Sequence, residues 1–357
     1  METLLQSLGT AHPPLYVTQR EAYAFFSQRF PLAPEEDALY RRLLLEGPVQ
    51  GRHLGMDSPE ESLEADPDRL NARFLRHARR TAADAARRAL AGAGLGAAAV
   101  GTLVVNTCTG YLCPGLSSYV AEDLGLSGDV HAVDIAGMGC GAALPNLQCA
   151  AGLLALDGAR PALSIAVEIC SATLFMGPDP GLIVSNSIFG DGAAAAVLTA
   201  GHETPAPRAA AKILGFASAL APEYREHLRY RQEGGRLRNH LGIRVPVIGA
   251  KLAERALSDL LEPRGLRRGD IRWWAVHAGG TSVLDRVGER LGLTPEDLRF
   301  SLEVFRTCGN MSSPSVLFGV ERLLRDGRPA AGDLGVMLAF GAGFSAFAAL
   351  LAFTGRG

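Results

Sequence analysis

The chain repeats one arrangement of apolar and glycine-containing segments, and this duplication constrains its fold more than any local preference does. Gly94-Leu95 precedes an apolar run that ends at Asn106, and Gly265-Leu266 precedes a second run that ends at His277. In both halves the polar residue lies 12 positions after the glycine. A repeat of this kind indicates that one supersecondary unit occurs twice.

Two further pairs of segments repeat in the same order. The segments at 189–192 (FGDG) and 340–343 (FGAG) each precede an apolar run, and DIAGMGC at 134–140 corresponds to VFRTCGN at 304–310. Apolar strands that alternate with helices are typical of layered α/β proteins. We therefore predict a duplicated αβαβα layered architecture with two pseudo-symmetric halves, residues 1–205 and 206–357. The boundary falls in a polar, proline-containing connector near 200–212.

The composition restricts the class of protein. Apolar residues make up 48% of the chain and charged residues 20%, which is typical of a well-buried globular protein. The formal net charge is −2 and basic runs are short, so a nucleic-acid partner is not expected. The start lacks the pattern of a secretion signal, and the six cysteines form no CxxC pair. We therefore expect a cytoplasmic protein without disulfides or a metal site.

The uncharged segment Leu334–Phe353 has the length of a membrane-spanning helix. Gly341 and Gly343 interrupt it, and the residues on either side suit buried strands. We therefore predict two short strands joined by a tight turn, with no integral membrane segment.

Cys140 is the first candidate for chemistry. It stands in GMGCGAALP, where glycines precede a helical pattern that continues to Leu154. The positive end of a helix dipole lowers the pKa of a thiol and favours the thiolate. The glycines permit a sharp turn and leave room for a substrate. The alternative is a cysteine that only packs a strand–helix joint.

His277 and Asn310 are the partners that the duplication predicts. His277 ends an apolar run and is followed by Ala278-Gly279-Gly280, while Asn310 lies in a turn before a helical pattern. Taken singly, a core histidine and a helix N-cap are the ordinary interpretations. The pseudo-twofold arrangement brings equivalent strand ends together, so we expect all three residues at one cleft.

Cysteine, histidine and asparagine together support two chemistries. In papain-type hydrolysis the asparagine orients the histidine as a general base. In thioester condensation the cysteine carries an acyl group, and histidine and asparagine donate hydrogen bonds to a thioester oxygen during decarboxylation. The duplicated architecture favours condensation. A catalytically silent subunit of a condensing enzyme is a non-enzymatic alternative.

The motifs around these residues resemble a known family. VHAGG around His277, GNMSSPSVLF from 309, IFGDGAAAA from Ile188 and FGAGF from Phe340 are similar to those of type III polyketide synthases, the chalcone-synthase-like group. The resemblance covers essentially the whole chain. It implies a thiolase-like fold, a homodimer, and no metal or organic cofactor. Ketoacyl-ACP synthase III enzymes, which catalyse a single condensation, are related but carry different flanks.

The resemblance also implies roles for individual residues. A starter acyl-CoA would load on Cys140, and malonyl-CoA would be decarboxylated at His277 and Asn310, before cyclisation to a resorcinol, pyrone or phloroglucinol-type product. The residues expected to line the substrate cavity are Cys108, Thr173, Phe189, Tyr230, Asn239 and Ser312. Those expected to bind CoA are Arg41, Arg42, Arg52, Gly279 and Gly280.

Several positions depart from the plant members of the family. Tyr230 stands where many members have glycine, and Asn239 stands where plant members have a second phenylalanine. Cys113 replaces a methionine that crosses the dimer in plant enzymes, and Ala342 replaces a proline. These differences argue against a plant-like aromatic starter and leave the starter open, while the GMGC and PGLS patterns resemble bacterial members of the family. A surface position for Tyr230 is the alternative to a cavity position.

Overall fold

A nine-stranded sheet organises the protein. The computed structural model describes residues 2–157, 160–201 and 209–355. The strand order is β11-β12-β13-β8-β1-β7-β6-β4-β5, and the two arms of the sheet meet where β1 pairs with β8 over three residue pairs. One arm consists of β1 (Thr3–Ala11), β7 (Gly192–Ala200), β6 (Ala162–Glu168), β4 (Thr102–Asn106) and β5 (His131–Ile135). The other consists of β8 (Ala211–Leu220), β13 (Ser345–Phe353), β12 (Leu334–Gly341) and β11 (Trp273–Val276).

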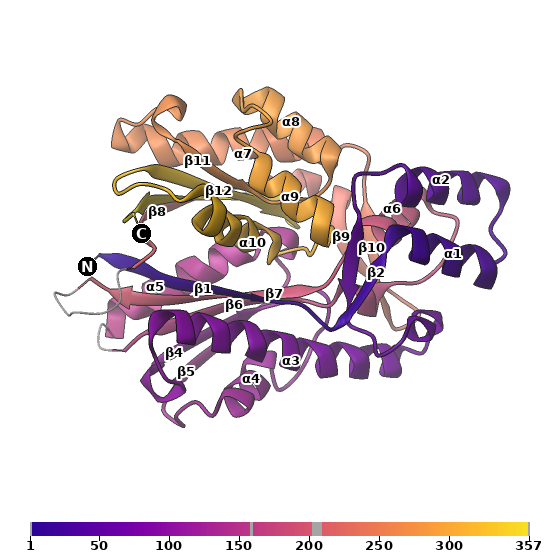
Figure 1. Ribbon diagram of the computed structural model, residues 1–357, viewed down its shortest axis with the longest axis horizontal. Helices are drawn as coiled ribbons and strands as arrows, with labels where there is room; N and C mark the ends of the chain where they lie inside the picture. The colour runs from indigo at the N-terminus through magenta and orange to yellow at the C-terminus, as the bar shows by residue number, and fades with distance from the viewer. Residues whose placement is uncertain (1, 158–159, 202–208, 356–357) are drawn as a thin grey trace.

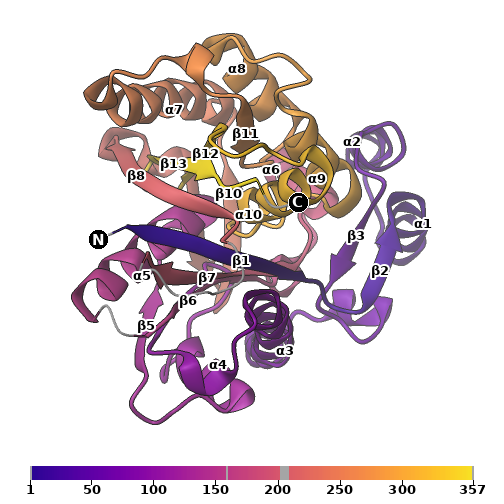
Figure 2. The same cartoon turned by 60° about the vertical axis from the view of Figure 1, so that its left-hand side comes forward.

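Helices cover both faces of each arm, as Figures 1 and 2 show. The central layer contains α5 (Ala143–Asp157) and α10 (Ser315–Arg322), whose apolar side chains share one buried cluster with both arms. Outside the first arm lie α3 (Pro67–Ala93) and α4 (Leu116–Leu124), and outside the second lie α7 (Val245–Leu261) and α8 (Thr281–Leu291). The predicted order of helix, sheet, helix, sheet and helix is confirmed.

Local sequence features explain two helix ends and one pair of strands. Gly125 and Gly292 end α4 and α8 with φ of 65° and 63°, a left-handed conformation that glycine adopts without a steric cost. The segment from Leu334 to Phe353 forms the antiparallel pair β12 and β13, as expected. No helix in the described part of the chain is long and apolar enough to cross a membrane.

The segment before Asn310 differs from the prediction. We expected Asn310 at a strand end equivalent to that before Cys140, but α9 (Arg299–Cys308) precedes it. The buried residues of this helix include Phe300, Val304 and Cys308, which recur at the spacing of one helical face. The repeated motif therefore has different secondary structure in the two halves. The predicted boundary at residue 205 lies outside the described residues.

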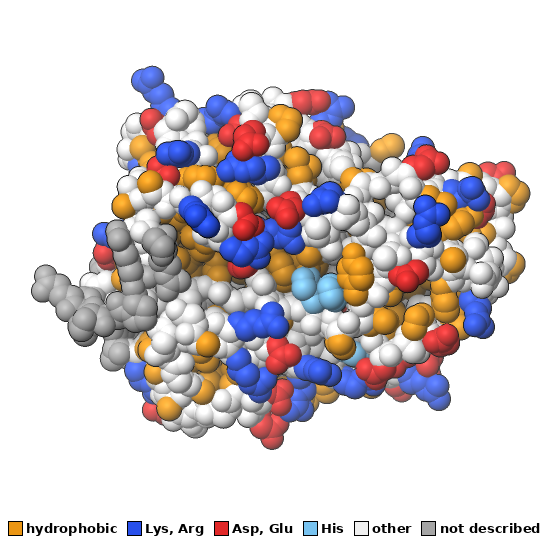
Figure 3. Space-filling model, in the orientation of Figure 1, with side chains coloured by type: hydrophobic (Ala, Val, Ile, Leu, Met, Phe, Trp, Pro, Cys, Tyr) orange, Lys and Arg blue, Asp and Glu red, His pale blue; other side chains and the backbone are white. Residues whose placement is uncertain are grey.

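A smaller lobe extends from one end of the layers, at the right of Figure 1. Its elements are β2 (Leu15–Thr18), α1 (Gln19–Arg29), α2 (Pro34–Leu45), β3 (Gly51–Leu54), α6 (Pro180–Ile188), β9 (Leu228–Glu233) and β10 (Arg236–Leu241). Phe26, Tyr40, Leu174 and Ile183 belong to its own apolar cluster. On the face shown in Figure 3, positive and negative side chains are interspersed.

Candidate active site

Cys140 lies in the turn between β5 and α5. A single 3₁₀ turn, Gly139–Gly141, contains it, and α5 begins at Ala143. Gly139 has a φ of 60°, which explains why a glycine directly precedes the cysteine. The hydroxyl of Ser312 donates a hydrogen bond to Cys140 Sγ over 3.3 Å. The thiol is thus held at the edge of the central layer.

The glycine loop between β12 and β13 packs directly against this turn. A Cβ atom on Gly341 would lie 2.6 Å from the amide nitrogen of Gly141 and 3.1 Å from that of Cys140. Next to it, the ring of Phe340 contacts the ring of His277 edge-on, with centroids 5.6 Å apart. This close approach requires glycine at 341. The Cys140 turn and His277 therefore both pack against the segment that contains Phe340 and Gly341.

His277 directly follows β11, as predicted, and is 1% exposed. Its backbone amide donates to the carbonyl of Leu338 over 2.8 Å, while its Nδ1 is buried without a hydrogen-bond partner among the described residues. Burial lowers the pKa of His277 to about 4. The imidazole is therefore neutral near pH 7, and can accept a proton or donate a hydrogen bond.

Asn310 is fixed by bonds from both its backbone and its side chain. Its amide donates to Ile188 O over 2.8 Å, and its Nδ2 donates to Gly279 O over 3.2 Å. Its Oδ1 accepts from the amide of Ser312 over 2.8 Å. The N-cap of α10 is Pro314, so the helix-cap interpretation of Asn310 is wrong.

These contacts join the three predicted residues into one connected group. Ser312 bonds to Cys140 through its hydroxyl and to Asn310 through its amide, and Asn310 in turn bonds to Gly279. The amide of Gly279 donates to His277 O over 2.9 Å, and a Cβ on Gly279 would lie 3.3 Å from His277 Nε2. The turn after β5, the loop after β11 and the segment after α9 thus meet at one place.

The surroundings of Cys140 act against the thiolate that the sequence suggested. Burial raises the pKa of Cys140 to about 12, although the hydrogen bond from Ser312 acts to lower it and the nearby Glu168 carboxylate acts to raise it. The helix starts three residues after the cysteine, and desolvation outweighs any effect of its dipole. Burial therefore acts against the thiolate that the sequence suggested, and it favours loss of the thiol proton during the reaction itself.

Glu168 is a site residue that sequence reasoning missed. It ends β6, is fully buried, and accepts hydrogen bonds from the Cys108 amide over 2.9 Å and the Ser313 hydroxyl over 2.7 Å. Its Oε1 also lies 3.2 Å from Cys108 Sγ, and burial raises the pKa of Glu168. The available signal was a lone acidic residue at the end of the apolar run ALSIAVE. Its carboxyl group orders Cys108 and the Ser312–Ser313 segment around the thiol.

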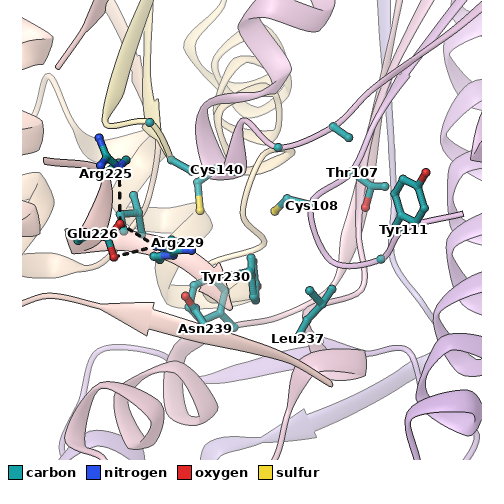
Figure 4. Close-up of a pocket in the computed structure, with 18 residues that line it drawn as sticks. Thr107, Cys108, Tyr111, Cys140, Arg225, Glu226, Arg229, Tyr230, Leu237 and Asn239 are labelled. Atoms are coloured by element: carbon teal, nitrogen blue, oxygen red, sulfur yellow. Dashed lines mark hydrogen bonds and ion pairs between the residues drawn. The ribbon is translucent and has the colours of Figure 1, made fainter. Parts of the chain in front are cut away.

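A cavity of about 570 Å³ opens beside Cys140 (Figure 4). Four of the predicted cavity residues line it, namely Cys108, Phe189, Tyr230 and Asn239. Tyr230 and Asn239 face each other across the β9–β10 hairpin, so Tyr230 has a cavity position and not a surface position. Ser312 donates a hydrogen bond to Cys140 but is not among the described residues that line the cavity.

Thr173 does not line the cavity beside Cys140, which corrects its predicted place. It lines a separate hollow of about 20 Å³, whose wall includes Phe189 and Asn239. Phe189 and Asn239 therefore line both the hollow and the larger cavity. The hydroxyl of Thr173 donates to Cys170 O over 2.8 Å within the 3₁₀ turn that contains both residues.

The predicted CoA residues lie in different environments. Arg52 is 2% exposed and donates to Gln19 Oε1 and to the carbonyls of Asn186 and Phe189 at 2.7–2.9 Å. Burial lowers the pKa of Arg52 to about 10. A guanidinium with these internal partners cannot reach a phosphate in solution, so the predicted phosphate contact of Arg52 is wrong.

The other CoA candidates remain accessible or lie beside the catalytic loop. Arg41 and Arg42 are exposed on α2, and Arg41 also donates to the hydroxyl of Tyr23 over 3.2 Å. Gly280 is the N-cap of α8, directly after Gly279. Sequence reasoning also missed Arg225, Glu226 and Arg229, which line the cavity from the β9 side.

Comparisons with known proteins agree with this geometry. A family model of FAE1/type III polyketide synthase-like proteins matches residues 40–214, and the C-terminal domain model of chalcone and stilbene synthases matches residues 216–353. The 3,5-dihydroxyphenylacetyl-CoA synthase of Streptomyces toyocaensis is 41% identical over 249 residues. That alignment covers 69% of this chain and 64% of the relative, which is less than two thirds of its length.

Two other relatives match over nearly their full length. Bisdemethoxycurcumin synthase of Oryza sativa subsp. japonica is 34% identical over 97% of this chain and 91% of its own. The crystal structure of 1,3,6,8-tetrahydroxynaphthalene synthase from Streptomyces coelicolor A3(2) superposes with a TM-score of 0.90 at 26% identity, covering 99% of this chain and 100% of that chain. The chain therefore belongs to the type III polyketide synthases, the family of the chalcone and stilbene synthases.

Proposed function

We propose that this protein condenses malonyl-CoA onto a starter acyl group carried on Cys140 and cyclises the product to a resorcinol, pyrone or phloroglucinol-type compound. The observation that carries this proposal is the connected group of Cys140, Ser312, Asn310, Gly279 and His277 beside a cavity of about 570 Å³. Relatives named for 3,5-dihydroxyphenylacetyl-CoA, alpha-pyrone and 1,3,6,8-tetrahydroxynaphthalene synthesis support the product class.

The loading step would use the neutral imidazole. Cys140 Sγ attacks the thioester carbonyl of the starter, and its proton passes to His277, whose low pKa keeps it unprotonated beforehand. The carbon–sulfur bond to CoA then breaks, and the CoA thiolate takes the proton from His277. Because the proton moves to His277 as the sulfur attacks, the reaction needs no stable thiolate, which burial of Cys140 disfavours.

The extension step would use hydrogen-bond donors instead of a base. His277 and the Asn310 amide donate to the thioester oxygen of malonyl-CoA, carbon dioxide leaves, and the resulting enolate attacks the acyl carbonyl on Cys140. A carbon–carbon bond forms between the two acyl groups. The carbon–sulfur bond to Cys140 breaks, and the sulfur of Cys140 leaves with the electron pair as a thiolate. Asn310 suits this role because two bonds already orient its amide group.

Two other functions give different products. A ketoacyl-ACP synthase III-like enzyme would stop after one condensation, and a Cys-His-Asn thioester hydrolase would release CoA without carbon dioxide. The test is incubation with carbon-labelled malonyl-CoA and a panel of acyl-CoAs, followed by mass spectrometry. We expect labelled carbon dioxide and cyclic products with two or more malonyl-derived units; hydrolysed starter alone would contradict the proposal.

We also propose that the protein acts in the cytoplasm, which cell fractionation would check. We further propose that it forms a homodimer through β5. β5 is the last strand of the sheet, and His131, Ala132 and Asp134 on it are exposed. An open edge of this kind offers backbone groups to a second strand. In the neighbouring loop Tyr111 is 76% exposed and Cys113 is exposed. Sedimentation equilibrium should give twice the chain mass of 37.6 kDa, and a monomer at micromolar concentration would contradict the dimer.

A further inference from the structure

An excess of positive charge lies on one wall of the Cys140 cavity. Arg225, Glu226 and Arg229 line this wall, and Figure 4 shows them joined by their ion pairs on one side of the pocket. Arg229 Nη1 lies 2.7 Å from both carboxylate oxygens of Glu226, while Arg225 Nε and Arg231 Nη2 lie 3.6 and 3.5 Å from them. Three guanidinium groups therefore share one carboxylate.

The charges on this wall contrast with the rest of the cavity. Among the described residues that line it, Arg225 and Arg229 are the only cations and Glu226 is the only anion. The remaining wall is apolar or uncharged and includes Leu228, Tyr230, Leu237, Ala136 and Gly137. A neutral acyl chain would have no use for two guanidinium groups, whereas a carboxylate accepts hydrogen bonds from an arginine in a two-pronged geometry.

The ion pairs with Glu226 do not prevent these arginines from binding a second carboxylate. The side chains of Arg229 and Glu226 are 39% and 54% exposed, and that of Arg225 is 68% exposed. Ion pairs at this exposure contribute little to stability because water and salt screen them. A second carboxylate can therefore join the group without displacing Glu226, because the arginines still carry the larger charge.

We propose that Arg225 and Arg229 bind a terminal carboxylate on the acyl group, so that the starter is the CoA monothioester of a dicarboxylic acid. The inference rests on the proposed function, since it assigns the substrate class to the same cavity. During loading the thioester end reaches Cys140, and the other end meets the arginines. The bonds that form and break at Cys140 are those of the loading step described above.

Two other anions reach this enzyme, and the chemistry argues against both. The carboxylate of the malonyl extender must leave as carbon dioxide, and a guanidinium that holds it would stabilise the state before decarboxylation. The phosphates of CoA are separated from the thioester by the whole pantetheine arm. The arginines, in contrast, line the same cavity as Tyr230, which is near enough to Cys140 and Cys108 for their charges to affect the pKa of its phenol.

The test compares starters that differ only in the terminal carboxylate. Loading of Cys140 is measured with succinyl- against butyryl-CoA, glutaryl- against pentanoyl-CoA, and adipyl- against hexanoyl-CoA. We expect kcat/KM for one dicarboxylic starter to exceed that of its partner by about tenfold or more, and Arg229→Met to reduce this ratio by about tenfold. Glu226→Gln should raise the ratio, because it removes the competing carboxylate.

Arg231→Met is the matched control. It removes the same charge from the same group of ion pairs, but Arg231 is not part of the described cavity wall, so the ratio should change by less than about twofold. Equal losses for both members of each pair in Arg229→Met would indicate a CoA phosphate contact and overturn the inference. N-acetylcysteamine thioesters, which lack phosphates, separate these cases because the expected ratio persists with them.

The inference would also be overturned if the dicarboxylic starter and its uncharged partner had nearly equal kcat/KM for loading in the unmodified protein and in every variant. Failure of the proposed function would give a different result, because no starter of either kind would then load on Cys140. Calorimetric binding of the same CoA thioesters to Cys140→Ala needs no chemistry and reports the ratio independently. Tighter binding of the dicarboxylic member, lost in Cys140→Ala combined with Arg229→Met, supports the carboxylate site.

Discussion

Cys140→Ala is expected to abolish acyl loading and to lower product formation by about 10⁴-fold or more, because no second group can replace a covalent nucleophile. Intact-mass spectrometry after incubation with an acyl-CoA should show the added acyl mass in the unmodified protein only. The change removes a sulfur that accepts one hydrogen bond from Ser312, so the fold should persist. Circular dichroism and the thermal midpoint check this.

Cys149→Ala provides the matched control for this experiment. Cys149 lies on α5, the helix that follows Cys140, and is partly buried without lining the cavity. Its loss should leave acyl loading within about twofold of normal, because the residue packs and does not react. If Cys140→Ala acquired the acyl group at the normal rate, the nucleophile would have to be reassigned, with Cys108 in the same cavity as the next thiol to test.

The parts of the site that follow from sequence are those fixed by local backbone chemistry. Gly139 and Gly341 are required by a left-handed φ and by a close approach to the Cys140 turn, so the glycine-rich motifs identified the right loops. Gly125 and Gly292 end helices in the left-handed conformation that glycine adopts without a steric cost. The duplication predicted that segments far apart in the sequence meet, and the two halves do pack together through the central helices.

The parts that sequence reasoning missed depend on burial and on tertiary contacts. The thiolate expectation for Cys140 considered the helix dipole and left out desolvation, which the full fold determines. Arg52 looked like a surface cation, yet the small lobe encloses it and three oxygen atoms satisfy its guanidinium. Glu168 was passed over because a lone acid at a strand end has no motif, and its partners come from distant segments.

These corrections change the role that we assign to His277. The sequence suggested a thiolate at Cys140, but burial lowers the pKa of His277 and raises that of Cys140, and both shifts favour the neutral forms. A neutral imidazole can accept the thiol proton during loading and donate a hydrogen bond during decarboxylation. His277→Ala should therefore damage both steps, which distinguishes it from a change at Asn310.

Asn310→Asp is expected to slow decarboxylation of malonyl-CoA by about 100–1000-fold, with a much smaller effect on acyl loading. The negative charge on the thioester oxygen exists only in the decarboxylation step, and one lost donor at such a site costs about 2.7–4 kcal/mol. Aspartate keeps an oxygen that can accept from the Ser312 amide but removes the Nδ2 donor. Ser312 should therefore stay near Cys140.

The two steps can be measured separately on the same protein. Release of labelled carbon dioxide from carboxyl-labelled malonyl-CoA reports decarboxylation, and intact mass after exposure to an acyl-CoA reports loading. Ser312→Ala is the control for disturbance of the thiol, because it removes the hydrogen bond to Cys140 and keeps the Asn310 amide. Decarboxylation at the normal rate in Asn310→Asp would leave Asn310 with a structural role only, in which its amide joins the segment after α9 to the loop after β11.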